Sequence, residues 1–199
     1  MTLAAVAPLA AARAQTTATD SVVYVLSPLS RFDVTTGKAG LLGFAGHEHV
    51  IRARAFAGRI VYHPEMPAAS RVEIVVQTDS LIVLTPPDTA EIRKVTAAMR
   101  TEVLDVARYP EIRFASRSIR SEDGRMHMIG ALTIKGTTRE LPLDVSLQVE
   151  RDTLRATATF AVKQTDFGIR PYRGGPAGTV RVADRVSFEI HAVAVRAGS

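Results

Sequence analysis

The sequence predicts an all-β domain whose antiparallel strands close into a barrel or fold into a sandwich, with one inserted helix. Apolar residues occupy every second position through long stretches such as 141–149. Short turn-forming sequences separate these stretches, and a single segment changes to helical spacing. Strict alternation places the apolar side chains on one face and the polar ones on the other, which is typical of antiparallel strands with one wet face.

The strands can be followed in order along the chain. The alternation is short at 72–76 and longer at 141–149, 154–162 and 186–194. Asp123-Gly124 is a hairpin signal between the segments 112–118 and 126–134. Turn residues at Gly136 and at Arg151-Asp152 separate the strands that follow. About eight twisted strands joined in this way form a meander that closes into a barrel or packs as a sandwich.

One amphipathic helix is predicted around 89–106. Pro86-Pro87 ends the preceding strand region, and Asp88 with Glu91 has the spacing of a capping box. A single apolar stripe then follows at helical spacing, made of Ile92, Val95, Met99, Val103 and Val106. We expect this helix to cover an open barrel end or a sheet edge.

The N-terminal residues predict export. Residues 3–12 form an apolar run too short to span a bilayer, and Ala12-Arg13-Ala14 resembles a signal-peptidase site. We therefore expect a signal peptide over 1–14 and a single mature domain over 15–199, located in the periplasm or secreted. The chain has no cysteine, which excludes disulfides, thiolate catalysis and Cys-ligated metals.

The charge pattern does not favour nucleic acid as a partner. The formal net charge is +5, but Lys and Arg are scattered singly among the strands. Aromatic residues make up only 6% of the chain, whereas barrels that bind nucleic acid interleave aromatic and basic residues. A solvated basic surface explains the charge.

The most conspicuous polar cluster is Gly46-His47-Glu48-His49. His47 and His49 share one side of a strand and offer two nitrogen ligands, so a metal site or a metal-dependent enzyme is one interpretation. The sequence places no third ligand nearby. Histidines hydrogen-bonded at a barrel rim are the plainer alternative.

A third interpretation follows from side-chain alternation. If this strand continues unbroken, both histidines point inward together with Ile51, Ala53, Ala55 and Ala57. Small side chains inside a barrel leave volume unfilled. The arrangement predicts a cavity with a polar mouth and an apolar body, suited to an amphipathic molecule.

No catalytic motif is present. The sequence lacks a G-x-S-x-G elbow, a P-loop and a G-x-G-x-x-G turn. Asp166-Phe167-Gly168 matches a kinase triplet without the remainder of that motif set. We therefore expect a binding protein that is not an enzyme and requires no cofactor.

Four short sequence motifs together resemble those of the YceI-like proteins, a family also described as polyisoprenoid-binding. The motifs are Phe56-Ala57-Gly58-Arg59-Ile60, RYPEIRF at 108–114, GALTIKGTT at 130–138, and Asp166-Phe167-Gly168-Ile169. The resemblance extends over about 22–195.

The resemblance implies a lipocalin-like antiparallel barrel that holds an isoprenoid-chain lipid or a quinone, for carriage or storage. The partner would be a long apolar small molecule, held by a monomer or a homodimer. A separate hypothesis is an interaction protein without a ligand, for instance a periplasmic accessory to a membrane redox complex. The side chains expected to contact the ligand are Phe44, His47, His49, Ile51, Ala53, Ala55, Phe114, Leu132, Ile134, Phe160 and Phe167.

Overall fold

The computed structural model describes residues 21–39, 48–84, 89–174 and 180–198. Its strands are β1 (Val22–Leu26), β2 (Arg31–Ala39), β3 (His49–Arg52), β4 (Phe56–Tyr62), β5 (Arg71–Gln77), β6 (Ile82–Val83), β7 (Glu111–Glu122), β8 (Arg125–Ile134), β9 (Thr137–Glu150), β10 (Thr153–Lys163), β11 (Arg173–Gly174) and β12 (Val180–Arg196). Its helices are α1 (Thr89–Ala98), a π-helical turn (Met99–Val103) and three short 3-10 helices, Pro67–Ala69, Thr78–Ser80 and Gln164–Phe167.

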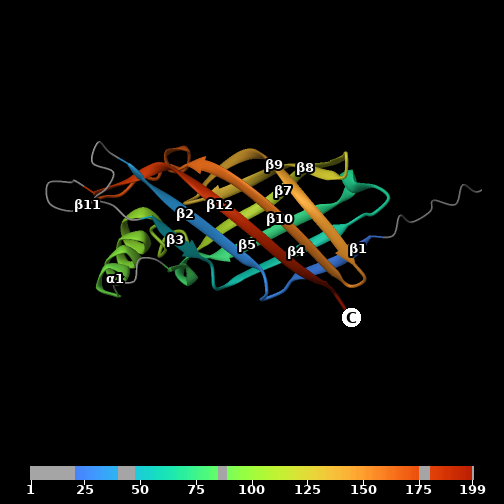
Figure 1. Cartoon of the computed structure of the whole chain (residues 1–199), viewed down its shortest axis with the longest axis horizontal. Coiled ribbons are helices and arrows are strands. Elements are labelled where there is room, and N and C mark those ends of the chain that lie inside the picture. The colour runs from blue at the N-terminus through green and yellow to red at the C-terminus, as the bar shows by residue number, and fades with distance from the viewer. Residues whose placement is uncertain (1–20, 40–47, 85–88, 175–179, 199) are drawn as a thin grey trace, which may run out of the picture.

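Among the described residues, eight strands close into a ring. Their order is β1-β4-β5-β7-β8-β9-β10-β12, and β12 pairs in turn with β1. Every pairing is antiparallel, and the long β10–β12 ladder keeps one register from Thr153↔Val195 to Lys163↔Arg185. The strands cross the elongated molecule obliquely, as closure of a barrel requires (Figure 1). The predicted all-β antiparallel barrel is confirmed. Because the eight strands form a closed ring, the sandwich alternative is wrong.

The first two strands share one long neighbour. The last three residues of β12, 194–196, pair with β1, and residues between 181 and 191 pair with β2. The ladder is interrupted between β1 and β2, where the Ser30 hydroxyl accepts from the Val193 amide and donates to the Val193 carbonyl. The Val193 carbonyl also accepts from the Ser27 amide, so the buried Ser30 hydroxyl chiefly supplies the acceptor for the Val193 amide. From β2 the sheet continues through β3 to β6.

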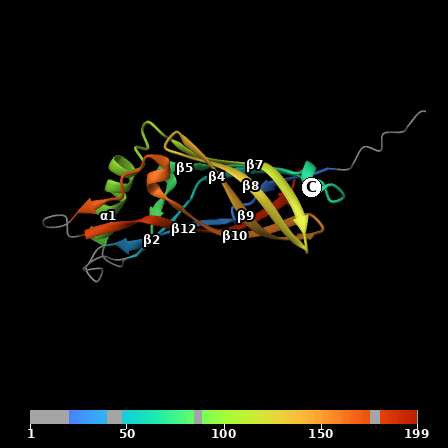
Figure 2. The ribbon, with the colours of Figure 1, turned by 90° about the horizontal axis from the view of Figure 1, so that it is seen from above.

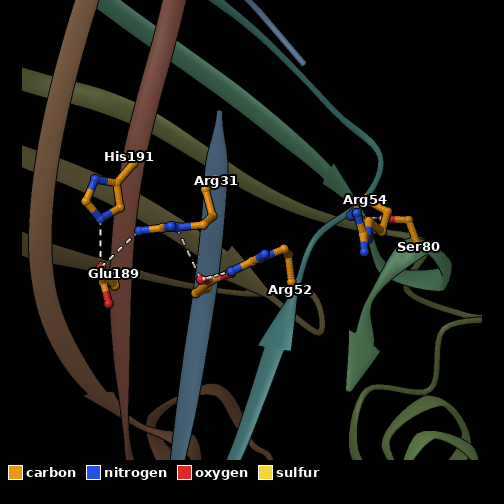
Figure 3. Close-up of polar contacts among 7 residues, drawn as sticks. Arg31, Arg52, Arg54, Ser80, Glu189 and His191 are labelled. Carbon is orange, nitrogen blue, oxygen red and sulfur yellow. Dashed lines mark hydrogen bonds and ion pairs between the residues drawn. The ribbon is translucent and has the colours of Figure 1, made fainter. Parts of the chain in front are cut away.

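A second break separates β3 from β4. The chain bends after Arg52, and the Ser80 hydroxyl accepts from the amides of Arg54 and Ala55, the former pair being drawn in Figure 3. The bend shifts the alternation, so that Ala53 is buried while Ala55 is exposed. The unbroken strand expected from His47 onward is therefore wrong, and so is the inward orientation of Ala55 and of Ala57, which is exposed too.

The helix lies at one end of the barrel, whereas β1 begins and the chain's C-terminus lies at the other (Figure 1, Figure 2). Two side chains attach the helical segment to the barrel end. Lys135 donates to the Val103 carbonyl at 3.0 Å, and Arg100 donates to the Asp79 carbonyl at 2.6 Å. The predicted helix over 89–106 is confirmed, with the difference that its last turn widens to π-helix and ends at Val103.

No helix among the described residues combines the length and apolar character needed to cross a bilayer.

Four apolar clusters form the core of the barrel. The cluster beneath α1 includes Phe32, Leu81 and Met99, and the cluster at the opposite end includes Tyr24, Leu154 and Ala194. The core residues are thus distributed along the barrel, and cavities remain among them.

The outer face of β12, β2 and β3 carries a polar network, part of which Figure 3 shows. Asp33 is buried and accepts two bonds of 2.7 Å from the Arg52 guanidinium. The Asp33 side chain is only 10% exposed, and Arg31 lies 3.5 Å from its Oδ2 oxygen. The Asp33 carboxylate in turn raises the pKa of Arg52 above its ordinary value.

We expect Arg52→Ala to lower the free energy of unfolding by about 2 kcal/mol, because it leaves the Asp33 carboxylate buried without its bidentate partner. Urea denaturation measures the change. Arg54→Ala is the matched control, since Arg54 is exposed, and a surface arginine contributes less than about 0.5 kcal/mol. Equal effects of the two substitutions would contradict a structural role for the Asp33–Arg52 pair.

Candidate functional site

The barrel interior contains two cavities in line. The first has a volume of about 190 Å³ and occupies the middle of the barrel and its far end. The second, of about 480 Å³, lies beneath α1. Five apolar residues line both cavities and form the boundary between them: Val34, Ile51, Leu81, Ile112 and Phe188. We call these two spaces the barrel chamber and the helix-end chamber.

Side chains from all around the ring line the barrel chamber. Most of them are branched aliphatic, aromatic or methionine, for example Val72, Ile74, Ile119, Met128 and Leu143. A bulge in β7 between Ser116 and Ser118 shifts the alternation, which lets Phe114 and Ile119 both line the chamber.

Small side chains on β10 and β12 create much of the space. Ala156 and Ala192 are direct cross-strand partners, Ala158 follows two residues later, and all three line the barrel chamber. The alanine wall predicted for the strand after His47 therefore exists mainly on β10 and β12, with Ala53 as its one member from the predicted segment. The alternation at 154–162 and 186–194 already contained this signal.

The Phe114 side chain lines the barrel chamber and packs against Gly130 of β8. A Cβ placed on Gly130, its neighbour on β8, would lie 2.1 Å from the Phe114 ring. The ring therefore lies flat against the β8 backbone, which keeps the middle of the chamber open. Phe160 and Phe188 stack next to it with ring centres 4.7 Å apart.

The helix-end chamber has a mixed lining. Val95, Ala98, Met99, Val103 and Leu104 form its wall from the helical side. The barrel strands contribute Ile134 and Val162 on the opposite side. Polar residues also line it, namely Thr36, His49, Lys94, Gln164, Tyr172 and Arg181.

The 3-10 helix Gln164–Phe167 closes one side of this chamber. Phe167 is only 1% exposed, and Gly168 follows it with a φ of 69°, a left-handed conformation that favours glycine. Asp184 accepts from the Thr165 amide at 2.9 Å and from its hydroxyl at 2.7 Å. These two bonds hold the pKa of Asp184 below its ordinary value. The Asp-Phe-Gly triplet is thus a turn that buries its phenylalanine.

The structure brings together most of the residues predicted to contact a ligand. Ala53, Phe114, Leu132 and Phe160 line the barrel chamber, His49, Ile134 and Phe167 line the helix-end chamber, and Ile51 lines both. Ala55 lines neither and is exposed. Phe44 and His47 lie outside the described residues.

Sequence reasoning missed the polar lining other than the histidine. Lys94, Gln164, Tyr172 and Arg181 come from separate segments of the chain, so no local spacing connects them. Their proximity depends on where α1 and the ends of β10 and β12 meet.

The predicted metal alternative required a third ligand beside His47 and His49. Among the described residues, no group of three His, Asp or Glu side chains is arranged to hold a metal ion. In the same part of the chain, Asp33 is the only acidic residue along either chamber, and its carboxylate is bonded to Arg52 in the network on the outer face.

A closed eight-stranded antiparallel barrel has an interior that side chains can fill or that can hold one small ligand, and two cavities remain inside this barrel. Comparisons with known proteins identify the family. The YceI-like domain family matches residues 29–194, and the chain belongs to it.

Relatives and solved structures agree with this assignment. Protein YceI of Salmonella arizonae is 27% identical over 97 residues, 49% of this chain and 48% of that protein. The chain thus aligns with about half the length of the curated relatives it matches. BcnA of Burkholderia cenocepacia superposes with a TM-score of 0.64 at 18% identity, covering 82% of this chain and 95% of BcnA.

A polyisoprenoid binding domain from Saccharophagus degradans superposes with a TM-score of 0.62 at 11% identity, covering 89% of this chain and 99% of that domain. At these identities the structural likeness shows the fold.

Proposed function

We propose that this chain is an exported binding protein that holds an isoprenoid-chain molecule, a prenyl lipid or a quinone, inside the barrel for carriage or storage. The observation that supports this proposal most strongly is that the two chambers lie in line and share a boundary of five apolar residues. An elongated apolar molecule fits this space better than a compact one. The proposal requires no cofactor and no reaction.

The chemistry of the lining supports a methyl-branched chain as cargo. The barrel chamber is lined by valine, isoleucine, leucine, methionine and phenylalanine around a wall of alanines. Burial of apolar area releases about 25 cal/mol per Å² before the costs of association. The affinity of a ligand for such a lining therefore depends more on the length of its apolar chain than on any particular polar group.

The N-terminal pattern supports export. The short apolar run at 3–12 and the A-x-A-like site at 12–14 have the order of a secretory leader. An isoprenoid chain is too apolar to cross an aqueous compartment unaided, so a barrel that encloses the chain suits the periplasm.

A series of prenyl alcohols tests the proposal. Geraniol, farnesol and geranylgeraniol differ only in the number of five-carbon units, and each unit is worth about 4 kcal/mol of gross transfer free energy at 0.8 kcal/mol per carbon. Ordering of the chain offsets part of this gain. We expect each added unit to tighten binding at least about tenfold, measured by displacement of a fluorescent fatty probe. Affinity that is independent of chain length would overturn the proposal.

A further inference from the structure

The outer face of the barrel carries apolar side chains where β4, β1 and β12 are paired with one another. Tyr24, Ile60 and Ala194 are buried in the core on these three strands, so the residues on either side of each point outward. These outward residues include five valines, none of which lines a chamber: Val23, Val25, Val61, Val193 and Val195. We call them the valine patch.

The valine patch is continuous across the strands and open to solvent. Val23 lies directly opposite Val61, and Val25 directly opposite Val195, and such pairs share one face of a sheet. Val25 and Val195 are 43% and 44% exposed. The turn after β1 adds Leu29, which is 77% exposed.

The neighbouring strands show that outward valines are a local feature. The residues that alternate with the chamber lining on β9 and β10 are polar and exposed, namely Asp144, Ser146, Gln148, Arg155, Thr157 and Thr159. The barrel therefore keeps a polar outer face on these strands and an apolar one on β1 and the end of β12. Contiguous exposed apolar surface with a polar border marks contact with a protein or a membrane.

Arginines border the valine patch. Three of its valines have an arginine as their direct cross-strand neighbour: Val25 has Arg59, Val61 has Arg71, and Val193 has Arg155. In these ladders no aspartate or glutamate lies directly opposite a patch valine. All three arginines are exposed, and none forms an ion pair with a residue that the structure describes, although Glu73 lies opposite Arg59. The surface therefore suits a partner that is both apolar and negatively charged.

The arginines disfavour a second copy of the chain as that partner. A two-fold contact places the same patch of both copies face to face, which brings the arginines of one copy toward those of the other. Like charges placed together across an interface oppose association. A bilayer with anionic lipids offers the opposite arrangement, because its phosphates lie above an apolar layer that short aliphatic side chains can enter.

We propose that the valine patch and its three arginines dock the barrel on the surface of an anionic lipid bilayer. The valines and Leu29 enter the boundary between head groups and acyl chains, and the arginines extend to the phosphates. The choice of a membrane over an acidic protein rests on the proposed function, because a carrier of membrane-soluble chains has to meet a membrane to load or unload them.

Sedimentation with lipid vesicles tests the inference. One set of vesicles contains phosphatidylglycerol mixed with phosphatidylcholine, and the other contains phosphatidylcholine alone. Neither contains a prenyl lipid, so the measurement is independent of the cargo. We expect the chain to bind the anionic vesicles at least about tenfold more tightly, and added salt to reduce this difference. Equal binding to both kinds of vesicle, or to neither, would overturn the inference.

The apolar contribution is tested with Leu29→Gln/Val195→Thr. Both residues are exposed, and threonine keeps the β-branched shape that suits a strand, so the barrel should stay folded. We expect binding to anionic vesicles to fall at least about fivefold. Leu84→Gln/Val149→Thr is the matched control, because it makes the same two changes at exposed residues outside the patch and should bind like the parent. A smaller loss in the patch variant than in its control contradicts docking through the patch.

The electrostatic contribution is tested with Arg59→Gln/Arg155→Gln. This variant should lose most of the preference for anionic vesicles. Arg93→Gln/Arg185→Gln removes the same charge from exposed positions on α1 and on the part of β12 that pairs with β10 ahead of the patch, and it should keep the preference. All variants have the same N-terminal residues, so differences among them report the substituted positions. Equal losses in the two arginine variants would show a general effect of net charge and overturn the inference.

The outcomes separate this inference from the proposed function. If geranylgeraniol binds the chain but anionic vesicles do not, the docking inference fails while the proposed function stands. If vesicles bind through the patch but no prenyl alcohol binds, the proposed function fails while the docking surface stands. Sedimentation velocity covers the remaining occupant: a dimer that Leu29→Gln/Val195→Thr dissociates, without vesicle binding by the parent, overturns the inference and assigns the patch to a second copy.

Discussion

Ala158→Phe should abolish binding of a C20 prenyl chain while the barrel stays folded. Ala158 lies on β10 between Val145 of β9 and Ile190 of β12, and its side chain lines the barrel chamber. A phenyl ring at this position occupies space that the tail would otherwise fill. Native mass spectrometry with geranylgeraniol measures the bound fraction, and we expect at least a hundredfold loss of affinity, about 2.7 kcal/mol.

Ala55→Phe is the matched control for this substitution. Ala55 is exposed beyond the bend that Ser80 stabilises, so a ring there should leave the affinity unchanged. Circular dichroism confirms that each variant is folded. Should Ala158→Phe fail to fold, Ala192→Leu blocks the same wall with a smaller side chain. A folded Ala158→Phe or Ala192→Leu variant that binds the tail like the parent would place the tail outside the barrel chamber.

Phe167→Ala should cause the largest loss of stability. Phe167 is 1% exposed and packs in the cluster of Leu132, Ile134 and Ile169 that closes the barrel beside the helix-end chamber. Truncating a buried phenylalanine to alanine costs about 3–5 kcal/mol, which lowers Tm by roughly 10 °C in a chain of this size. Calorimetry measures the shift.

Leu29→Ala provides the comparison, since Leu29 is 77% exposed and should change stability by less than about 0.5 kcal/mol. Phe167→Ala also enlarges the helix-end chamber. A ligand that fills the chamber should therefore stabilise this variant more than the parent. A Tm within 2 °C of the parent would contradict the role of Phe167 as a closing side chain.

Much of the fold could be predicted from the sequence because it depends on local patterns. Alternation of apolar residues at 141–149, 154–162 and 186–194 reappears as the long strands β9, β10 and β12. The Asp123-Gly124 turn joins β7 to β8, with Asp123 at a φ of 48° and Gly124 at 73°. The apolar stripe from Ile92 to Val103 predicted the helix, and its residues pack against the barrel core.

The site was predicted less completely because irregular backbone controls it. A bend at Ala53 to Ala55 reverses the side to which the following residues point, and Ser80, which stabilises it, is distant in sequence. The polar lining of the helix-end chamber comes from five strands or helices and from the loop that carries Tyr172. Alternation locates inward positions along one strand, but it does not reveal which ends of separate strands meet.

A crystal structure of the chain with geranylgeraniol tests the central claim most directly. The account predicts continuous elongated density inside the barrel, running from the alanine wall at Ala156 and Ala192, past Phe114, to the helix-end chamber. The hydroxyl end should lie near His49 and Gln164. Density for the chain on the outer surface, with the interior unoccupied at saturating ligand, would contradict the account.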